Sequence, residues 1–294
     1  MEMLDQIKTI IEENRESKSI YWRAGVLLKD CAWIISNRPL RYLKGKKKIA
    51  WCTNKRRVEI EITTSCNLKC INCNRSCRQA PSEEHMSLKQ IKKFIDESIC
   101  LNWKWESIKI LGGEPTLHPQ LPAILKIFKR YKKFYPESNI RFLTNGFGDK
   151  VNNILKILPP WLIIENSKKK SSMQKFSSYN LAPIDMKRYK NADFTKACWN
   201  TEHCGLGLTR YGYYLCGPGA SIDRVFGLDT GIKNLSSVND STLMQQRGRL
   251  CRYCGMYKEK DYKMGRRIKK EKMSLTWIKA YKKYKKEKPK LSLY

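Results

Sequence analysis

The chain of 294 residues carries 59 Lys and Arg against 27 Asp and Glu, a net charge of +32, and 41% of its residues are hydrophobic. This length suits one large domain with or without a small appendage, and the hydrophobic content excludes a disordered chain. The charge favours contact with polyanions or an anionic membrane surface, unless it only reflects a lysine-rich composition.

Twelve cysteines are spread over the chain. Residues 1–15 mix both charges and contain no apolar segment of the kind that secretory signals require. No later run reaches the length of a membrane span. We therefore expect a cytoplasmic protein whose cysteines bind metal or act in catalysis rather than form disulfides.

Residues 1–56 are predicted to form a basic, helical extension. Aromatic and aliphatic residues at helical spacing, among them Tyr21, Trp22 and Trp33, give it one apolar face. Such a face normally packs against the rest of the protein. Because a lysine-rich run follows at 44–48, an alternative is a helix that lies on the inner surface of an anionic membrane.

Strands and helices then alternate along the chain. Val58, Ile60 and Ile62 alternate with polar residues, as expected for a strand. Comparable patterns predict strands at 57–63, 107–111, 139–144 and 161–165, and helices at 87–101, 121–135 and 151–158. Strand–helix units in this order indicate an α/β fold with a parallel sheet or barrel.

Three cysteines follow the first predicted strand: Cys66, Cys70 and Cys73. Thiolates ligate iron–sulfur clusters, and cysteines this close on one loop can reach separate irons of one cluster. Three ligands leave one iron open, and an open position is where a metal site does chemistry. A zinc site is the alternative that this spacing alone allows. Cys77 extends the group to four cysteines; a fourth ligand in a resting state and a substrate-linking thiol are alternatives, and we interpret it as a spare thiol.

Two short motifs end the next two predicted strands. Gly112-Gly113-Glu114-Pro115 joins glycines, which let backbone carbonyls approach a ligand, to a carboxylate that suits an ammonium group. Thr144-Asn145-Gly146 ends the third strand. Because parallel barrels have their active sites at the carboxyl ends of their strands, we expect these motifs to meet the cysteine loop.

With these motifs the sequence resembles the radical S-adenosylmethionine (radical SAM) superfamily, whose three cysteines have the same C-x3-C-x2-C spacing after the first barrel strand. The resemblance implies a partial parallel (β/α) barrel with a [4Fe-4S] cluster on the three cysteines. It implies one-electron cleavage of S-adenosylmethionine to a 5′-deoxyadenosyl radical that abstracts hydrogen from a substrate. It also implies a set of S-adenosylmethionine-binding residues: Gly112, Gly113, Glu114, Pro115, Thr144 and Asn145.

A second group of cysteines lies towards the C-terminus. Cys204 and Cys216 flank a predicted hairpin, and Cys251 and Cys254 come later. Two pairs supply four ligands, enough for a closed iron–sulfur cluster or a structural zinc ion, and Cys198 is an alternative to Cys204. The pattern resembles the SPASM/Twitch auxiliary region of radical SAM enzymes, which implies an auxiliary [4Fe-4S] cluster on Cys204, Cys216, Cys251 and Cys254.

We therefore predict four regions along the chain. They are the basic helical extension at 1–56, a radical SAM core at 57–197, a small cysteine-rich SPASM/Twitch-like region at 198–256, and a basic helical tail at 257–294. The segment 255–294 holds 15 basic and 4 acidic residues, a net charge of +11.

The resemblance implies an oxidoreductase that modifies a peptide or protein, because the auxiliary region most often accompanies such substrates. It also implies an electron donor such as flavodoxin or ferredoxin. The positive charge supports two alternatives: a glycan or lipid-linked anionic substrate, met through peripheral contact with an anionic membrane, and RNA, for which no binding motif is visible. A non-enzymatic zinc- or iron–sulfur-binding module is the alternative from another class.

Overall fold

The computed structural model describes residues 52–173, 179–196, 198–257 and 272–294. By its internal contacts the chain separates into two units, 1–50 and 51–294, and the described residues all belong to the second unit. The predicted N-terminal extension, apart from positions 52–56, therefore lies outside the described residues. So does the part of the predicted tail at 258–271.

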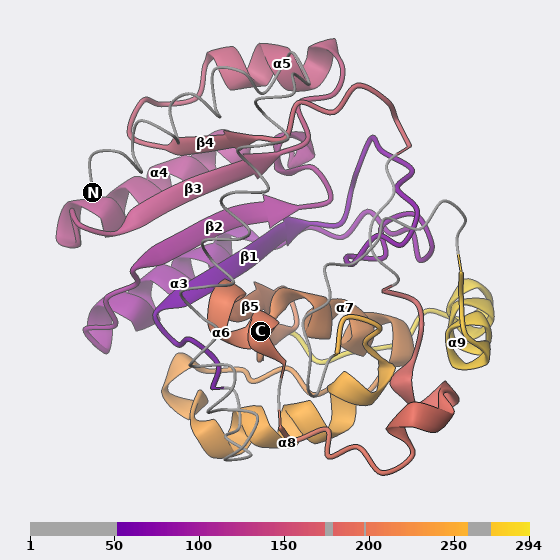
Figure 1. Ribbon diagram of the computed structural model, residues 1–294. Coiled ribbons are helices and arrows are strands. Elements are labelled where there is room, and N and C mark those ends of the chain that lie inside the picture. Colours follow the sequence, from indigo (N-terminus) through magenta and orange to yellow (C-terminus); the bar gives the residue numbers. More distant parts are fainter. Residues whose placement is uncertain (1–51, 174–178, 197, 258–271) are drawn as a thin grey trace, which may run out of the picture. The chain divides into compact units, whose positions relative to one another are not determined.

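Four parallel strands and three helices form the first part of the described unit (Figure 1). They are β1 (Arg57–Thr63), α3 (Leu88–Cys100), β2 (Ser107–Gly112), α4 (Leu121–Phe134), β3 (Asn139–Thr144), α5 (Asp149–Lys156) and β4 (Ile163–Asn166). Each predicted element is present, and its ends agree with the prediction to within two residues. The predicted α/β fold with a mostly parallel sheet is confirmed.

The cysteine-rich part of the chain adds a hairpin to the same sheet. β5 (Leu206–Thr209) pairs in parallel with β1, and β6 (Gly212–Tyr214) pairs antiparallel with β5. The strand order is therefore β4-β3-β2-β1-β5-β6. The hairpin predicted between Cys204 and Cys216 is present, and it extends the sheet beyond β1. This places the chain after β6 near the loop that follows β1.

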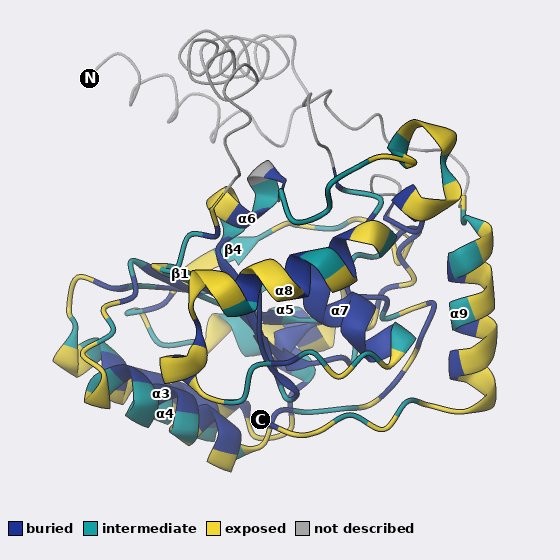
Figure 2. Ribbon diagram, turned by 90° about the horizontal axis from the view of Figure 1, so that it is seen from below, coloured by how far each residue is buried: buried dark blue, intermediate teal, exposed yellow. Residues whose placement is uncertain are grey.

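Helices flank the hairpin and complete the described unit. They are α6 (Trp199–Cys204), α7 (Gly217–Phe226), α8 (Asp240–Leu250) and α9 (Leu275–Lys286), with short 3-10 turns at Pro115–Leu117, Pro183–Asp185, Lys187–Tyr189, Leu235–Ser237 and Cys251–Tyr253. Figure 2 shows α7 as a buried helix, whereas α8 and α9 each leave one face exposed. α9 lies within the predicted tail helix. None of the described helices combines the length and apolar character needed to cross a membrane.

β1 is buried on both of its faces. Val58, Ile60 and Ile62 are fully buried among the residues of the main core, on one face. Glu59 and Glu61 point to the other face and are each only 7% exposed. Alternation of polar and apolar residues normally accompanies a solvated polar face. The carboxylates of β1 are buried instead because side chains from the cysteine loop cover them, as described below.

Candidate active site

The loop after β1 holds the three predicted cluster cysteines at the carboxyl edge of the sheet. Cys70 is buried, and Cys66 and Cys73 are partly exposed. The backbone N–H of Leu68 donates to the Cys66 sulfur at 3.4 Å. Burial raises the pKa of Cys66 to about 12, and the neighbouring sulfurs of Cys73 and Cys70 add to the rise. The three sulfurs therefore lie near enough to repel one another as thiolates, which a metal's positive charge would relieve.

Gly112 and Gly113 stand where the end of β2 meets the start of this loop. A Cβ on Gly112 would lie 2.3 Å from a backbone carbonyl oxygen of β1. A Cβ on Gly113 would lie 2.3 Å from the Ser65 carbonyl oxygen and 2.8 Å from the Cys66 Cβ. The backbone N–H of Glu114 donates to the Ser65 carbonyl at 2.8 Å. Glycine is required here because the two motifs touch backbone to backbone.

The Glu114 carboxylate joins the ends of β2 and β3. Its Oε1 accepts from the Thr144 hydroxyl at 2.8 Å and from the Thr116 hydroxyl and backbone N–H at 2.9 and 3.2 Å. Its Oε2 accepts from the backbone N–H of Asn145 at 2.8 Å. The residue is fully buried, and burial raises the pKa of the carboxyl group despite these hydrogen bonds. All four of these donors are protein groups, whereas the sequence suggested an ammonium ligand.

Asn145 connects this junction to the cysteine loop. Its side-chain Nδ2 donates to Asn67 Oδ1 at 2.8 Å, and Asn67 Nδ2 donates to the Phe147 carbonyl at 2.7 Å. The Asn145 Oδ1 accepts from the backbone N–H of Phe147 at 2.8 Å. The three motifs predicted to meet therefore do meet, through a continuous set of hydrogen bonds from Glu114 to Asn67.

Two buried residues of the loop have left-handed backbone conformations, Asn72 with φ of 56° and Ser76 with φ of 51°. Asparagine tolerates this region better than most residues do. Asn180 donates to Asn72 Oδ1 at 3.5 Å, and the Tyr281 hydroxyl donates to Asn180 Oδ1 at 2.9 Å. The Tyr281 and Ser76 hydroxyls are 3.0 Å apart. α9 thereby holds the shape of a loop that lies far away in sequence.

Cys77, interpreted from the sequence as a spare thiol, contacts a predicted cluster ligand. Its thiol donates to the Cys73 sulfur, and this hydrogen bond is the main cause that lowers the pKa of Cys73, to about 6. The pKa of Cys77 itself is raised as a result. The pair therefore favours a thiolate at Cys73, the form in which cysteine binds metal.

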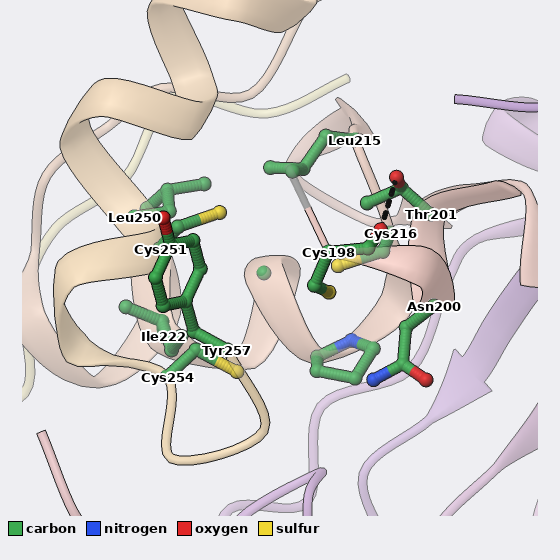
Figure 3. Close-up of a pocket in the computed structure, with 12 residues that line it drawn as sticks. Cys198, Asn200, Thr201, Leu215, Cys216, Ile222, Leu250, Cys251, Cys254 and Tyr257 are labelled. Atoms are coloured by element: carbon green, nitrogen blue, oxygen red, sulfur yellow. Dashed lines mark hydrogen bonds between the residues drawn. The ribbon is translucent and has the colours of Figure 1, made fainter. Parts of the chain in front are cut away.

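Four cysteines line one pocket at the start of α7: Cys198, Cys216, Cys251 and Cys254. Figure 3 shows Cys251 and Cys254 on one side of the pocket and Cys198 and Cys216 on the other. All four are buried. Burial, followed by the neighbouring cysteine sulfurs, raises the pKa of both Cys216 and Cys251.

Cys204, predicted to act with Cys216, does not line this pocket. It ends α6, whereas Cys198 immediately precedes that helix. Burial raises the pKa of Cys204 to about 11, and Glu59 and Lys109 are among the charges that act on it. The structure therefore places Cys198, the alternative ligand, with Cys216, and places Cys204 towards the carboxylate face of β1.

Each of the two sets consists of cysteine thiols. Among the described residues, no three His, Cys, Asp or Glu side chains are arranged to hold one metal ion. The ligands of a [4Fe-4S] cluster bind different irons, so their sulfurs lie farther apart. Thiols alone make up both sets, and thiolate is the donor that these clusters prefer.

The fold and this site define an α/β protein with a three-cysteine loop at the carboxyl edge of a parallel sheet. Residues 60–159 match the family model of the Radical SAM superfamily. This segment is therefore similar to members of that superfamily. The cysteine loop and both motifs at the ends of β2 and β3 fall inside the matched range.

Curated relatives match over limited stretches. A protein named "Probable GTP 3',8-cyclase" from Methanococcus maripaludis is 35% identical over 91 residues, 31% of this chain and 29% of that protein. A 7,8-dihydro-6-hydroxymethylpterin dimethyltransferase from Methanocaldococcus jannaschii is 26% identical over 162 residues, 52% of this chain and 31% of that protein. The chain thus spans less than a third of either relative. The crystal structure of BtrN in complex with AdoMet and 2-DOIA aligns over 70% of this chain and 94% of BtrN. The alignment has a TM-score of 0.40 and a sequence identity of 12%.

Two residues of the cysteine loop that shape the site were not singled out from the sequence. Asn67 connects the loop to the end of β3, and Arg75 carries a charge that is buried against β1. Their only signal in the sequence is their position among the cysteines. A buried arginine and a solvated one look alike in a sequence pattern.

Proposed function

We propose that this chain is a radical SAM enzyme in which Cys66, Cys70 and Cys73 hold a [4Fe-4S] cluster and the ends of β2 and β3 bind S-adenosylmethionine. The observation that carries the proposal is the hydrogen-bonded junction of the three motifs. Glu114 accepts from the Asn145 backbone, and the Asn145 side chain donates into the cysteine loop. The junction keeps the cysteines and the strand ends next to each other, as a cluster and its ligand would need.

When bound, the cluster and S-adenosylmethionine supply the reductive cleavage that yields a carbon radical. The chain's own residues prepare the place where this happens. Gly112 and Gly113 keep the backbone at the end of β2 free of side chains. Glu114 and Asn145 fix the relative position of the two strand ends, so that ligand contacts there are preorganised.

We further propose an auxiliary [4Fe-4S] cluster in the four-cysteine pocket, as in SPASM/Twitch-like regions. Its ligands are Cys198, Cys216, Cys251 and Cys254. Two features support the proposal: all four thiols are buried around one pocket, and burial, followed by the neighbouring sulfurs, raises the pKa values of Cys216 and Cys251. Buried protonated thiols stabilise one another only weakly, whereas cluster irons would bind all four as thiolates.

The substrate of the proposed enzyme is not carried over from the relatives. Their names describe reactions on GTP and on a hydroxymethylpterin, which gives no support to the predicted peptide or protein substrate. The peptide or protein substrate remains a prediction, and an anionic glycan or lipid-linked substrate and RNA remain its alternatives. The electron donor, flavodoxin or ferredoxin, and the peripheral contact with a membrane also remain predictions.

The test is anaerobic reconstitution of the full chain with iron and sulfide, followed by reduction with dithionite and incubation with S-adenosylmethionine. We expect about eight irons per chain, because two four-iron clusters bind. We also expect 5′-deoxyadenosine to form. The variant Cys66→Ala should retain about four irons and form no 5′-deoxyadenosine. Cys100→Ser, a change at an exposed thiol of α3 outside both ligand sets, serves as the matched control and should keep both clusters.

Iron that is unaffected by Cys66→Ala would overturn the assignment of the first cluster. Zinc in place of iron in the reconstituted chain would leave a metal-binding module instead of an enzyme. Full cluster content without any 5′-deoxyadenosine would contradict the proposed activity while leaving the cluster sites in place.

A further inference from the structure

Arg75 lies two positions after Cys73 in the sequence. Its side chain contacts the face of β1 that carries Glu59 and Glu61. Its Nη2 is 2.6 Å from Glu59 Oε2, and its Nε is 3.9 Å from Glu61 Oε2. The side chain is only 10% exposed. A charge this deeply buried is stable only when its surroundings compensate it, and Glu59 does so for one side of the guanidinium.

The other side of the guanidinium faces the second cysteine site. A Cβ on Gly217 would lie 2.0 Å from Nη1 and 2.5 Å from Nη2, so Arg75 packs directly on the Gly217 backbone. Gly217 is the first residue of α7, and the residue before it, Cys216, lines the four-cysteine pocket. Nη1 is fully buried and has no hydrogen-bond partner among the described residues. One arginine thus stands between the two cysteine sites.

This position is unfavourable for a cation unless an anion is also present. The N-terminus of a helix carries a partial positive charge, so an arginine packed there is repelled. α7 has ten residues, and its N-cap residue Cys216 makes no side-chain cap hydrogen bond within the described chain. Both Arg75 and the start of α7 therefore direct positive charge at Cys216. Glu59 compensates the guanidinium only from β1, and a cluster bound through four thiolates would add negative charge on the Gly217 side, where Nη1 has no hydrogen-bond partner among the described residues.

We propose that Arg75 is a positioning residue that sets the reduction potential of the auxiliary cluster and links it electrostatically to the loop of the first cluster. This inference rests on the proposed function, because it requires a cluster in the four-cysteine pocket. A nearby positive charge stabilises the more negative, reduced form of a cluster and so raises its reduction potential. The packing against Gly217 makes the effect specific to the Cys216 side of the pocket.

The test uses the full chain with Cys66, Cys70 and Cys73 replaced by alanine, so that only the auxiliary cluster gives a signal. The reduction potential is measured by a dithionite titration followed by electron paramagnetic resonance, with iron content as a check. Arg75→Gln should shift the potential to a more negative value, whereas Arg75→Lys, which keeps the charge, should shift it less. Lys109→Gln is the matched control: Lys109 pairs with the same Glu59 carboxylate at 3.5 Å from β2, and its loss should leave the potential unchanged.

Gly217→Ala provides a second test that leaves Arg75 in place. The new Cβ would displace the end of a flexible side chain from the start of α7, so the potential should again become more negative. If Arg75→Gln loses its cluster, the reduction potential of Gly217→Ala tests the role of Arg75 instead. A potential that is unchanged in Arg75→Gln or in Gly217→Ala at full iron content would refute the role of Arg75. If the variant with only Cys66, Cys70 and Cys73 replaced by alanine binds no iron, the auxiliary cluster itself is refuted.

Discussion

Replacing Glu114 separates two explanations of the Gly-Gly-Glu-Pro motif. In the structure this carboxylate accepts four hydrogen bonds from protein groups, two of them from the backbone N–H groups of Thr116 and Asn145. In Glu114→Ala the hydroxyl donors can rotate to other acceptors, but the two backbone N–H groups cannot. A buried donor left unpaired costs about 1–3 kcal/mol, so the two together should lower the free energy of unfolding by about 2–6 kcal/mol.

Glu114→Gln should lower the free energy of unfolding by less than Glu114→Ala does. Its carbonyl oxygen can still accept at the Oε1 position, while its amide nitrogen meets the Asn145 N–H, so one donor is lost. We expect the free energy of unfolding to fall by about 1–3 kcal/mol. Both values are large beside a total stability of about 5–15 kcal/mol for a protein domain.

The measurement is urea unfolding of each variant without S-adenosylmethionine, together with the affinity of the reconstituted chain for S-adenosylmethionine. The hydrogen-bonded junction predicts that both variants lose stability before any ligand is added. A Glu114→Ala variant as stable as the natural chain, but with much weaker S-adenosylmethionine binding, would refute this reasoning. It would mean that the carboxylate serves the ligand directly, as the sequence motif by itself suggests.

Three further predictions follow from the geometry. Cys198→Ala should lower the iron content by about four per chain, whereas Cys204→Ala should leave it unchanged; the reverse result would restore the ligand set expected from the sequence. The pKa of His118 is lowered by burial, so its unfolded form takes up a proton first and the free energy of unfolding should fall as pH drops below the ordinary value of 6.5. His118→Gln should flatten this dependence in urea unfolding at pH 5–7, and an identical pH profile in both proteins would contradict it. Gly113→Ala, whose Cβ would lie 2.3 Å from a backbone oxygen of the cysteine loop, should abolish binding of the first cluster, whereas Gly248→Ala, with its nearest neighbour at 3.7 Å, should not.

The sequence alone determined the order of the strands and helices. Each strand–helix unit up to β4 has a local pattern of its own, such as the apolar residues at 58, 60 and 62, or the cap at Ser87. The motifs at the strand ends could be read for the same reason, because the residues that form each turn are neighbours in the chain. The expectation that they meet at one edge followed from parallel strands, and the bonds between Glu114, Asn145 and Asn67 bear it out.

The ligand set of the second site could not be read from the chain. Cys198 and Cys204 stand at opposite ends of one short helix, and both precede the hairpin, so spacing does not distinguish them. Only the folded structure shows that Cys198 lines the pocket with Cys216.

The buried charges were likewise decided only by the tertiary structure. Glu59 looks like an outward residue of an amphipathic strand, and Arg75 looks like a loop cation. Their burial arises because Arg75 packs between Glu59 of β1 and the start of α7, and α7 follows the β5–β6 hairpin that joins the sheet beside β1. Such pairs join residues far apart in sequence. Their free energy depends on how completely water is excluded around both partners, and this is a property of the assembled fold that no local pattern contains.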